Sequence, residues 1–405
     1  MTDNVIILGA GASVNAGIPL LANFVEKMWE FSITGKHNGK DLSEEDKRIF
    51  NEAMKVKNEL DGYHGRAAFN DRNIEDILSI LSFNLIGGKK TDIEKQKWFI
   101  KAITRTIDLT CNVLHDGKLN KIQTKGNQIY RKFWYGLFNR FKVSPRSFPT
   151  IISFNYDLVL ERSLLQSLIS TNYTQYNNEF PFGGVNIKYH YGFIKDLSFK
   201  IKYTRFVTSL SDLGEESGMT LEPSDEPVNN SIDVELLKLH GSLNFPAQKE
   251  EVFAPTQVAN NPYILPPIIN KWVGKNEESI WSTGLQRLRE AKNIIIVGYS
   301  LPQTDIFMQY FLRAGVGPNL NLNKVIVFNP TLYQTGTDNE LMRERFGNCF
   351  SPQLRNRINF NPTNFTDSST SYYSPNGTFG AFVDGSDETD WFFGHYEKGK
   401  KSYGF

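Results

Sequence analysis

The sequence predicts an α/β fold: a Rossmann-like parallel sheet with an inserted helical subdomain and a C-terminal appendage. Two observations predict it. Five short runs of aliphatic and β-branched residues, typical of buried parallel strands, recur within the first 330 residues, and small or polar residues follow each run. A long stretch with helical periodicity, residues 43 to about 145, separates the first run from the second.

The first run, residues 5–8, leads into a glycine-rich turn and then a helix. The turn reads Gly-Ala-Gly-Ala-Ser over residues 9–13, and Gly-Ile-Pro follows at 17–19. Small residues in such a turn let backbone N–H groups approach a pyrophosphate. Val14, however, replaces the last glycine of Gly-x-Gly-x-x-Gly. Tight turns also use glycine for steric reasons alone, so both interpretations remain open.

The stretch from 43 to about 145 contains three apolar stripes at helical spacing, and the third is rich in aromatic residues. Such stripes are typical of helices that pack against one another. We expect them to form a helical subdomain inserted into the α/β core. A second insertion, at about 170–235, is predicted to be loop-rich with some β-hairpin.

The other four strands are predicted at residues 150–154, 235–239, 293–297 and 324–328. The polar or small residues that follow them are Asn155, Asp157, His240, Gly298, Ser300 and Asn329. In an open α/β sheet, ligands bind outside the carboxyl ends of the strands. We therefore expect these residues and the first glycine turn to face one shared site.

Three of these side chains have a structural interpretation beside the functional one. His240 stands at a strand end and can titrate near neutral pH, but taken alone it is more often a structural histidine that holds a loop. Asp157 is suited to capping the helix that follows it, whatever else it does. Asn155 is less easily explained as a cap.

Composition limits the classes of function. The chain has 405 residues, with 45 basic and 44 acidic side chains and a net charge of +1, which gives no reason to expect binding to nucleic acid or a membrane. Two isolated cysteines, Cys111 and Cys349, exclude a disulfide framework and a four-cysteine zinc site. We see no signal peptide and no apolar run long enough to span a membrane, so a cytoplasmic location is expected.

The motifs in their order resemble the sirtuin family, and most of all the bacterial sirtuin-like proteins of anti-phage defence systems. The resemblance rests on Gly-Ala-Gly-Ala-Ser with Gly-Ile-Pro, Phe-Asn-Tyr-Asp, Leu-His-Gly-Ser, Val-Gly-Tyr-Ser-Leu and Phe-Asn-Pro. The segment Asn-Ile-Glu-Asp-Ile-Leu at 73–78 is also similar to that branch. The resemblance implies that residues 1–330 form an NAD-binding catalytic domain and that 331–405 form the appendage.

The resemblance also implies roles for single residues. His240 would be the general base, and Asn155 would hold the nicotinamide ribose or a water molecule. The residues expected to contact NAD are Gly9, Ala10, Gly11, Ala12, Ser13, Gly17, Ile18, Pro19, Asp157, Gly298, Ser300 and Asn329. NAD would be consumed as a substrate, and no metal is expected.

Two departures from deacylating sirtuins narrow the function. Those enzymes follow Gly-Ile-Pro with Asp-Phe-Arg, where this chain has Leu-Leu-Ala, and they carry a four-cysteine zinc ribbon. We therefore expect an NAD glycohydrolase that releases nicotinamide and ADP-ribose, or cyclic ADP-ribose. The alternatives are a protein deacylase or ADP-ribosyltransferase, and a non-catalytic nucleotide-binding module.

Regulation by assembly is expected, because uncontrolled NAD hydrolysis would kill the host. The resemblance implies a homo-oligomer, or a partner such as a HerA-like ATPase or a short Argonaute. The appendage is expected to be loosely packed. Its aromatic residues Trp391, Phe392 and Phe393 are a candidate contact, although packing onto their own core is an equal alternative.

Overall fold

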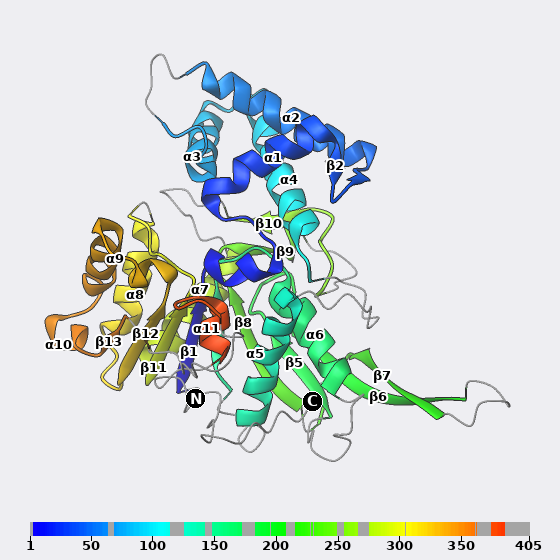
Figure 1. The fold of residues 1–405 in the computed structure, drawn as a ribbon, viewed down its shortest axis with the longest axis vertical. Coiled ribbons are helices and arrows are strands. Elements are labelled where there is room, and N and C mark those ends of the chain that lie inside the picture. Colours follow the sequence, from blue (N-terminus) through cyan, green and yellow to red (C-terminus); the bar gives the residue numbers. More distant parts are fainter. Residues whose placement is uncertain are drawn as a thin grey trace.

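The structure is a computed structural model that describes residues 3–63, 69–113, 125–141, 148–171, 183–194, 196–207, 215–226, 228–229, 231–248, 255–265, 275–303, 305–360, 362 and 374–384. Among these residues, nine strands form one sheet in the order β13-β12-β11-β1-β4-β8-β5-β6-β7 (Figure 1). The strands are β1 (Asn4–Leu8), β4 (Thr150–Ser153), β5 (Gly184–Lys188), β6 (Leu197–Val207), β7 (Glu215–Ser224), β8 (Ser231–Lys238), β11 (Asn293–Val297), β12 (Lys324–Phe328) and β13 (Ile358–Asn359).

The five strands predicted from the sequence are confirmed as the parallel centre of this sheet. β1 is hydrogen-bonded in parallel to β11 on one side and to β4 on the other. β8 continues the parallel sheet beyond β4, and β12 continues it beyond β11. All five residues of β1 are buried, as expected for a strand covered on both faces. The α/β, Rossmann-like architecture is therefore confirmed.

The strand order creates a crevice at the carboxyl ends of β1 and β11. The chain first runs outward from β1 to β4 and β8, and later returns to the opposite side of β1 to form β11 and β12. Ligands bind at such reversals in open α/β sheets, where helices diverge to opposite faces. Gly9 and Gly298 follow the two strands at this point.

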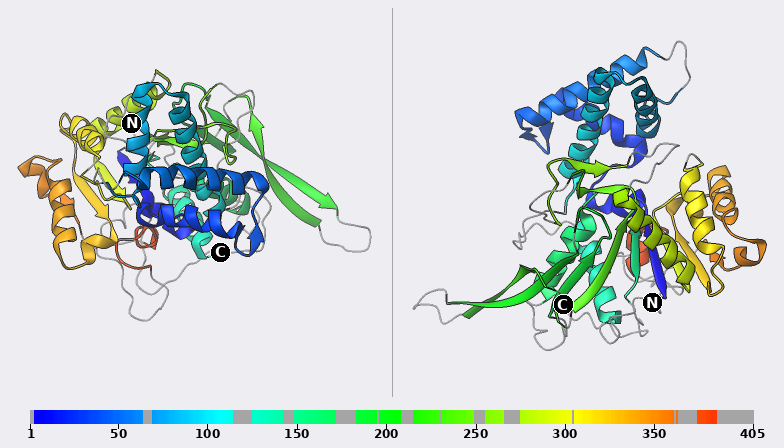
Figure 2. Two further views of the ribbon diagram at one scale, coloured as in Figure 1. Left: turned by 90° about the horizontal axis from the view of Figure 1, so that it is seen from above. Right: turned by 180° about the vertical axis from the view of Figure 1, so that it is seen from behind.

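Helices cover both faces of the sheet (Figures 1 and 2). α5 (Lys125–Phe141), α6 (Val159–Thr171) and α11 (Phe379–Asp384) lie on one face, and α7 (Lys275–Glu290) packs with α8 (Ile306–Val316) on the other. A short 3₁₀ helix, η1 (Ala10–Ala16), follows β1. It packs against α5, where the Tyr130 hydroxyl donates to the carbonyl of Ala12 at 2.7 Å.

Four other helices form a separate layer above the carboxyl edge of the sheet (Figure 1). They are α1 (Leu21–Thr34), α2 (Glu44–Asp61), α3 (Ile74–Asn84) and α4 (Lys90–Thr110), and we call them the helical module. Ser43 caps α2 by accepting from the Asp46 N–H, and Asn73 caps α3 by accepting from the Glu75 N–H. A small hairpin of β2 (Lys36–His37) and β3 (Lys40–Asp41) joins α1 to α2.

The module differs from the insertion expected at 43–145. α1 belongs to it, whereas α5 packs on the sheet against α6 and η1. The aromatic stripe of α5 is buried there, and the indole N–H of Trp134 donates to the Ser163 hydroxyl of α6 at 2.9 Å. Periodicity shows which face of a helix is buried, but it cannot show which neighbour covers that face.

The insertion expected at 170–235 contributes strands to one edge of the sheet. β5 pairs with β8 in parallel, and β6 and β7 form an antiparallel hairpin that extends well beyond the body (Figure 2). The predicted hairpin is therefore present. Two more strands, β9 (Gly241–Pro246) and β10 (Pro262–Ile264), pair with each other near the carboxyl edge.

The described part of residues 331–405 packs against the core. η4 (Pro330–Tyr333), α9 (Thr337–Gly347) and α10 (Pro352–Arg355) lead to β13, which joins the sheet edge. In α11, Phe379 and Phe382 are buried against α5 and β12. Trp391, Phe392 and Phe393 lie outside the described residues. Within the described parts, no helix is long and apolar enough to cross a membrane.

Candidate functional site

A cavity of about 160 Å³ lies between the helical module and the carboxyl edge of the sheet. Residues on strand ends form its floor, and apolar residues of α1, α3 and α4 form its roof. Of the residues predicted to form the site, those that line it are Ala10, Ser13, Ile18, Pro19, Asn155, Asp157, His240, Gly298 and Ser300. Gly9, Gly11, Ala12, Gly17 and Asn329 are not among its lining residues.

The glycine turn after β1 packs tightly against the turn after β11. A Cβ on Gly9 would lie 2.6 Å from the Cα of Tyr299, and one on Gly11 would lie 2.8 Å from the Cα of Gly298. The N–H groups of Gly9 and Gly11 donate to the carbonyls of Val297 and Gly298. The Ala12 N–H donates to the carbonyl of Gly9. Steric need thus accounts for the two glycines, and three N–H groups of the turn already have partners within the protein.

Asn155 joins the end of β4 to the turn after β1. Its side-chain nitrogen donates to the Gly9 carbonyl at 2.9 Å and to the Ser13 hydroxyl at 2.8 Å. The Ser13 hydroxyl in turn donates to Asp157 Oδ2 at 2.7 Å. This chain of hydrogen bonds fixes two strand ends relative to each other. It also engages the amide nitrogen of Asn155 with Gly9 and Ser13.

Asp157 has the capping role that the sequence suggested. Its Oδ1 accepts from the Val159 N–H at the start of α6, at 3.0 Å, while Oδ2 accepts from Ser13. The residue is buried. Both carboxylate oxygens therefore stabilise the floor of the cavity.

A buried ion pair supports this floor from below. Lys238, the last residue of β8, donates from Nζ to the backbone carbonyl of Asp157 and lies 3.5 Å from Oε1 of Glu161. Lys238 is 1% exposed and Glu161 is 0% exposed. Burial raises the pKa of Glu161, although the nearby Lys238 charge opposes this. The pair connects β8, which leads to His240, with the loop that carries Asn155 and Asp157.

His240 is more enclosed than its position at a strand end suggested, since only 5% of it is exposed. Its ring lies 5.1 Å from the ring of Phe154 and 6.4 Å from that of Trp281, centroid to centroid. The next residue, Gly241, has a φ of +82°, and a Cβ there would lie 2.3 Å from the carbonyl oxygen of Tyr263. The backbone at this point thus needs glycine, and the turn directs the histidine toward the cavity.

Two of the predicted residues have clear structural contacts outside the cavity. Gly17 has a φ of +86° and ends η1 in close contact with Thr110 and Asn112 at the end of α4. Asn329 is buried and caps η4 by accepting from the Thr331 N–H at 3.0 Å. The Asn112 N–H donates to the Ala16 carbonyl at 2.7 Å, so the end of η1 is one place where the module is joined to the core.

Several lining residues were not selected from the sequence. Phe154, Tyr156 and Tyr299 flank the predicted strand-end residues, and a survey of the neighbours of each strand end could have found them. Glu75 and Asp305 also line the cavity, from α3 and from the N-terminal cap of α8. Glu75 belongs to the segment 73–78 that matched the sirtuin-like branch, but no role was assigned to it, because only the docking of α3 brings it over the sheet.

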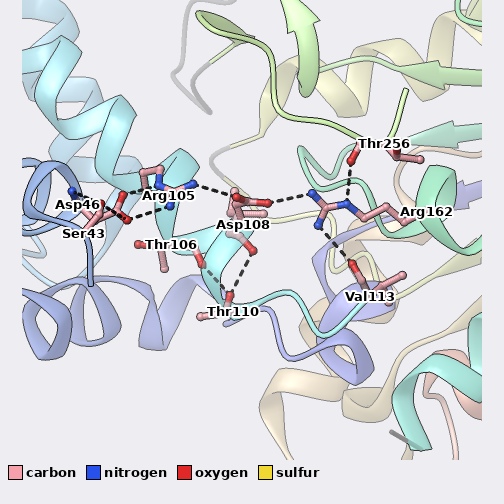
Figure 3. A network of polar contacts seen from close by, with 10 residues as sticks. Ser43, Asp46, Arg105, Thr106, Asp108, Thr110, Val113, Arg162 and Thr256 are labelled. Atoms are coloured by element: carbon pink, nitrogen blue, oxygen red, sulfur yellow. Dashed lines mark hydrogen bonds and ion pairs between the residues drawn. The ribbon is translucent and has the colours of Figure 1, made fainter. Parts of the chain in front are cut away.

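A second contact between module and core is polar (Figure 3). Arg105 of α4 binds both carboxylate oxygens of Asp46 of α2, at 2.6 and 3.0 Å, and donates to Asp108 at 2.9 Å. Asp108 also accepts from Arg162 of α6 at 2.9 Å. Arg162 donates further to the carbonyls of Thr256 and Val113. We call Asp46, Arg105, Asp108 and Arg162 the polar seam.

The described residues contain no group of three or more His, Cys, Asp or Glu side chains placed to hold a metal ion. Cys111 and Cys349 are both buried and unpaired as disulfides, one after α4 and the other after α9. Burial raises the pKa of the Cys111 thiol to about 11, so the thiol form prevails at neutral pH.

Comparisons with known proteins add little to this description. No protein-family model matches the sequence. No curated protein matches it either. Among solved structures, the chain is similar to a mutant Sir2 homologue in complex with ADP-ribose, at 10% sequence identity and a TM-score of 0.29. That match covers 85% of this chain and 91% of the other. The fold assignment rests on the strand order and pairing described above.

Proposed function

We propose that the protein binds NAD at the carboxyl edge of its sheet and hydrolyses the bond between nicotinamide and ribose. The observation that carries the proposal is that Ser13, Asn155 and His240 line one cavity although they follow three different strands. The cavity lies beside the reversal of strand order, where nucleotides bind in this class of sheet. The sequence motifs that resemble sirtuin-like NAD hydrolases are the same strand ends.

The proposed reaction needs few catalytic groups. Water attacks the ribose carbon as the glycosidic bond breaks, nicotinamide leaves as a neutral pyridine, and the water proton is lost, giving ADP-ribose. His240 accepts that proton as general base. The amide oxygen of Asn155 holds the ribose or the water, since the amide nitrogen is engaged by Gly9 and Ser13. The imidazole is shielded from bulk water, because His240 is buried and lies beside the rings of Phe154 and Trp281.

Phosphate binding by the glycine turn takes a specific form in this proposal. Since the N–H groups of Gly9, Gly11 and Ala12 already have partners and the Ser13 hydroxyl donates to Asp157, the pyrophosphate would meet Ala10, which lines the cavity. Gly298 and Ser300 would contact it from the neighbouring strand end. The two glycines of the turn would serve by allowing the turns after β1 and β11 to lie close together.

The test is incubation of the purified protein with NAD, with nicotinamide and ADP-ribose separated by chromatography. His240→Ala should lower nicotinamide release by about 10²-fold or more, the scale typical of a general base. His37→Ala is the matched control, because this histidine lies in the hairpin of the module and does not line the cavity. His240→Gln fills more of the buried volume than His240→Ala does. It therefore controls for a loss of activity that is caused by unfolding. Near-full cleavage by both His240 variants would overturn the assignment.

The same assay separates hydrolysis from the alternatives. Release of nicotinamide without an acyl-lysine peptide or another acceptor supports a glycohydrolase, and cyclic ADP-ribose would appear as a separate product. Dependence on an acceptor would favour a deacylase or an ADP-ribosyltransferase. No turnover under any condition would favour a nucleotide-binding module.

We further propose that turnover depends on assembly and serves anti-phage defence, as in the proteins whose motifs this chain resembles. Turnover per protein molecule should then rise with concentration, or on addition of the product of a neighbouring gene. A dilute monomer with full activity, unaffected by such a neighbour, would contradict regulation by assembly.

A further inference from the structure

The charges around the cavity are all of one sign. Three carboxylates line it, those of Glu75, Asp157 and Asp305, and no lysine or arginine is among its described lining residues. Aromatic side chains make up much of the rest of the floor, including Phe154, Tyr156 and Tyr299. Carboxylates and aromatic faces both attract cations, and low-dielectric walls strengthen the field of the carboxylates inside a cleft.

Two of the three carboxylates also support the local backbone. Asp157 caps α6 and accepts from Ser13. Asp305 caps α8 by accepting from the Met308 N–H, and its Oδ2 accepts from the Tyr299 hydroxyl at 2.8 Å. Both belong to the α/β core.

Glu75 differs because it comes from the helical module. It lies in the first turn of α3, where Asn73 accepts from the Glu75 N–H at 2.8 Å. The buried neighbours Ile74, Ile77 and Leu78 anchor this turn, and Glu75 itself is half-buried. The carboxylate is thus held over the floor by helix packing.

The negative charge of Glu75 affects the pKa of two tyrosines on the floor of the cavity. Burial raises the pKa of Tyr156, and the negative charges of Glu75 and Asp305 raise it further. Burial also raises the pKa of Tyr299, with contributions from Asp305 and then from Glu75. Both tyrosines belong to the core, so the field of the α3 carboxylate crosses the cavity.

We propose that Glu75 is a specificity-determining residue that makes the cavity select a positively charged nicotinamide ring. This inference rests on the proposed function and deepens it. The ring of oxidised NAD carries one positive charge, whereas the reduced ring has almost the same size and no charge. A carboxylate facing the ring favours the first over the second, and the aromatic floor adds to that preference. The site then binds the oxidised form, which is the form with a good leaving group.

The direct test compares two probes that differ in charge and little in shape, 1-methylnicotinamide and nicotinamide. The full-length protein should bind the cationic probe about tenfold more tightly, a difference of ~1.4 kcal/mol. In Glu75→Gln this ratio should fall severalfold, because only Asp157, Asp305 and the aromatic floor then favour the cation, while the thermal midpoint stays close to that of the wild type. Glu94→Gln is the matched control, since it removes an exposed carboxylate of α4 that does not line the cavity.

Kinetics supply the second measurement. Glu75→Gln should lower kcat/KM for NAD by about tenfold and should weaken the discrimination against NADH as a competing ligand by a similar factor. Glu94→Gln should leave both unchanged. An unchanged ratio of the two probes in Glu75→Gln, or a wild type that does not prefer the cationic probe, would overturn the inference.

The role of Glu75 and the hydrolase activity can each fail while the other stands. If the wild type cleaves NAD but Glu75→Gln keeps the full preference for the cation, the hydrolase stands and the role of Glu75 fails. If the wild type shows a preference that depends on Glu75 but never cleaves NAD, the role of Glu75 stands and the hydrolase fails.

Discussion

The helical module meets the α/β core in two regions of opposite character. At the polar seam, Asp46, Arg105, Asp108 and Arg162 form a continuous series of ion pairs from α2 through α4 to α6 (Figure 3). At the cavity, the module presents apolar side chains, among them Ile103 and Ile107 of the same helix α4. One helix thus makes close, directional contacts with one side of the core and leaves space above the other.

The polar seam and the apolar roof of the cavity therefore have different structural roles. Ion pairs with hydrogen bonds need specific geometry, so the seam defines how the module sits on the core. Apolar contacts are not directional, so the roof of the cavity can adapt to what lies beneath it. The position of Glu75 then depends on the seam, although the seam does not touch the cavity.

The largest effect is expected from removing the buried end of the seam. Arg162 is only 6% exposed, and it satisfies Asp108 and the carbonyls of Val113 and Thr256. Arg162→Met should lower the free energy of unfolding by about 3 kcal/mol or more, because Asp108 loses one of its two arginine partners and two carbonyls lose a charged donor. Urea unfolding measures this. A loss below about 1 kcal/mol would show that the seam does not hold the module.

A loss of function with little loss of stability is expected at the cavity. Asn155→Ala should lower NAD turnover by about 10²-fold, the scale of a lost positioning group. Its cost in stability should stay near ~1 kcal/mol for each of its two hydrogen bonds, to Gly9 and Ser13. Asn58→Ala, at an exposed position of α2, serves as the control. Equal turnover of the two variants would contradict a role for Asn155 in the reaction.

The sequence predicted the core and one side of the cavity because both depend on local pattern. β-branched runs indicated the five central strands, and their polar ends indicated Asn155, Asp157 and His240. The roof was not predictable in this way. The segment 73–78 matched a motif of the sirtuin-like branch, but its pattern does not show that Glu75 lies over the cavity, which depends on the docking of α3.

The seam and the pair beneath the floor escaped prediction for a related reason. Arg105 and Asp108 occur at a spacing typical of a solvated helix face, so their pattern does not reveal a partner on α6. Lys238 ends a strand where a lysine would ordinarily reach solvent, yet the loop after β4 and α6 covers it completely. Contacts between residues far apart in sequence decide these positions.

A moderate effect of acid is expected at the other end of the seam. Burial alone would raise the pKa of Asp46, but hydrogen bonds from Arg105 and Ser43 outweigh it and lower the pKa below the ordinary value of 3.8. A lowered pKa in the folded state stabilises the protein above 3.8, and this contribution is lost as pH falls through the folded-state pKa.

Unfolding measured from pH 6 down to about pH 2.5 tests this. The wild type should lose stability steeply below pH 4, whereas Arg105→Met should start from a lower stability and lose less over the same interval. Parallel curves for the two proteins would show that the pairing of Arg105 with Asp46 does not set the acid response.

The smallest effect is expected from an ion pair that resembles those of the seam in distance alone. Lys55 and Glu52 lie one turn apart on α2, with Nζ 2.7 Å from Oε1, close to the 2.6 Å between Arg105 and Asp46. The Lys55 side chain, however, is 68% exposed. Water screens the attraction, and holding a long side chain in place costs entropy, so such pairs contribute little. Lys55→Gln should change the free energy of unfolding by less than about 0.5 kcal/mol and should leave NAD turnover unchanged. A loss as large as that of Arg162→Met would mean that charge on α2 stabilises the module in general, and the contrast between buried seam and open surface would fail.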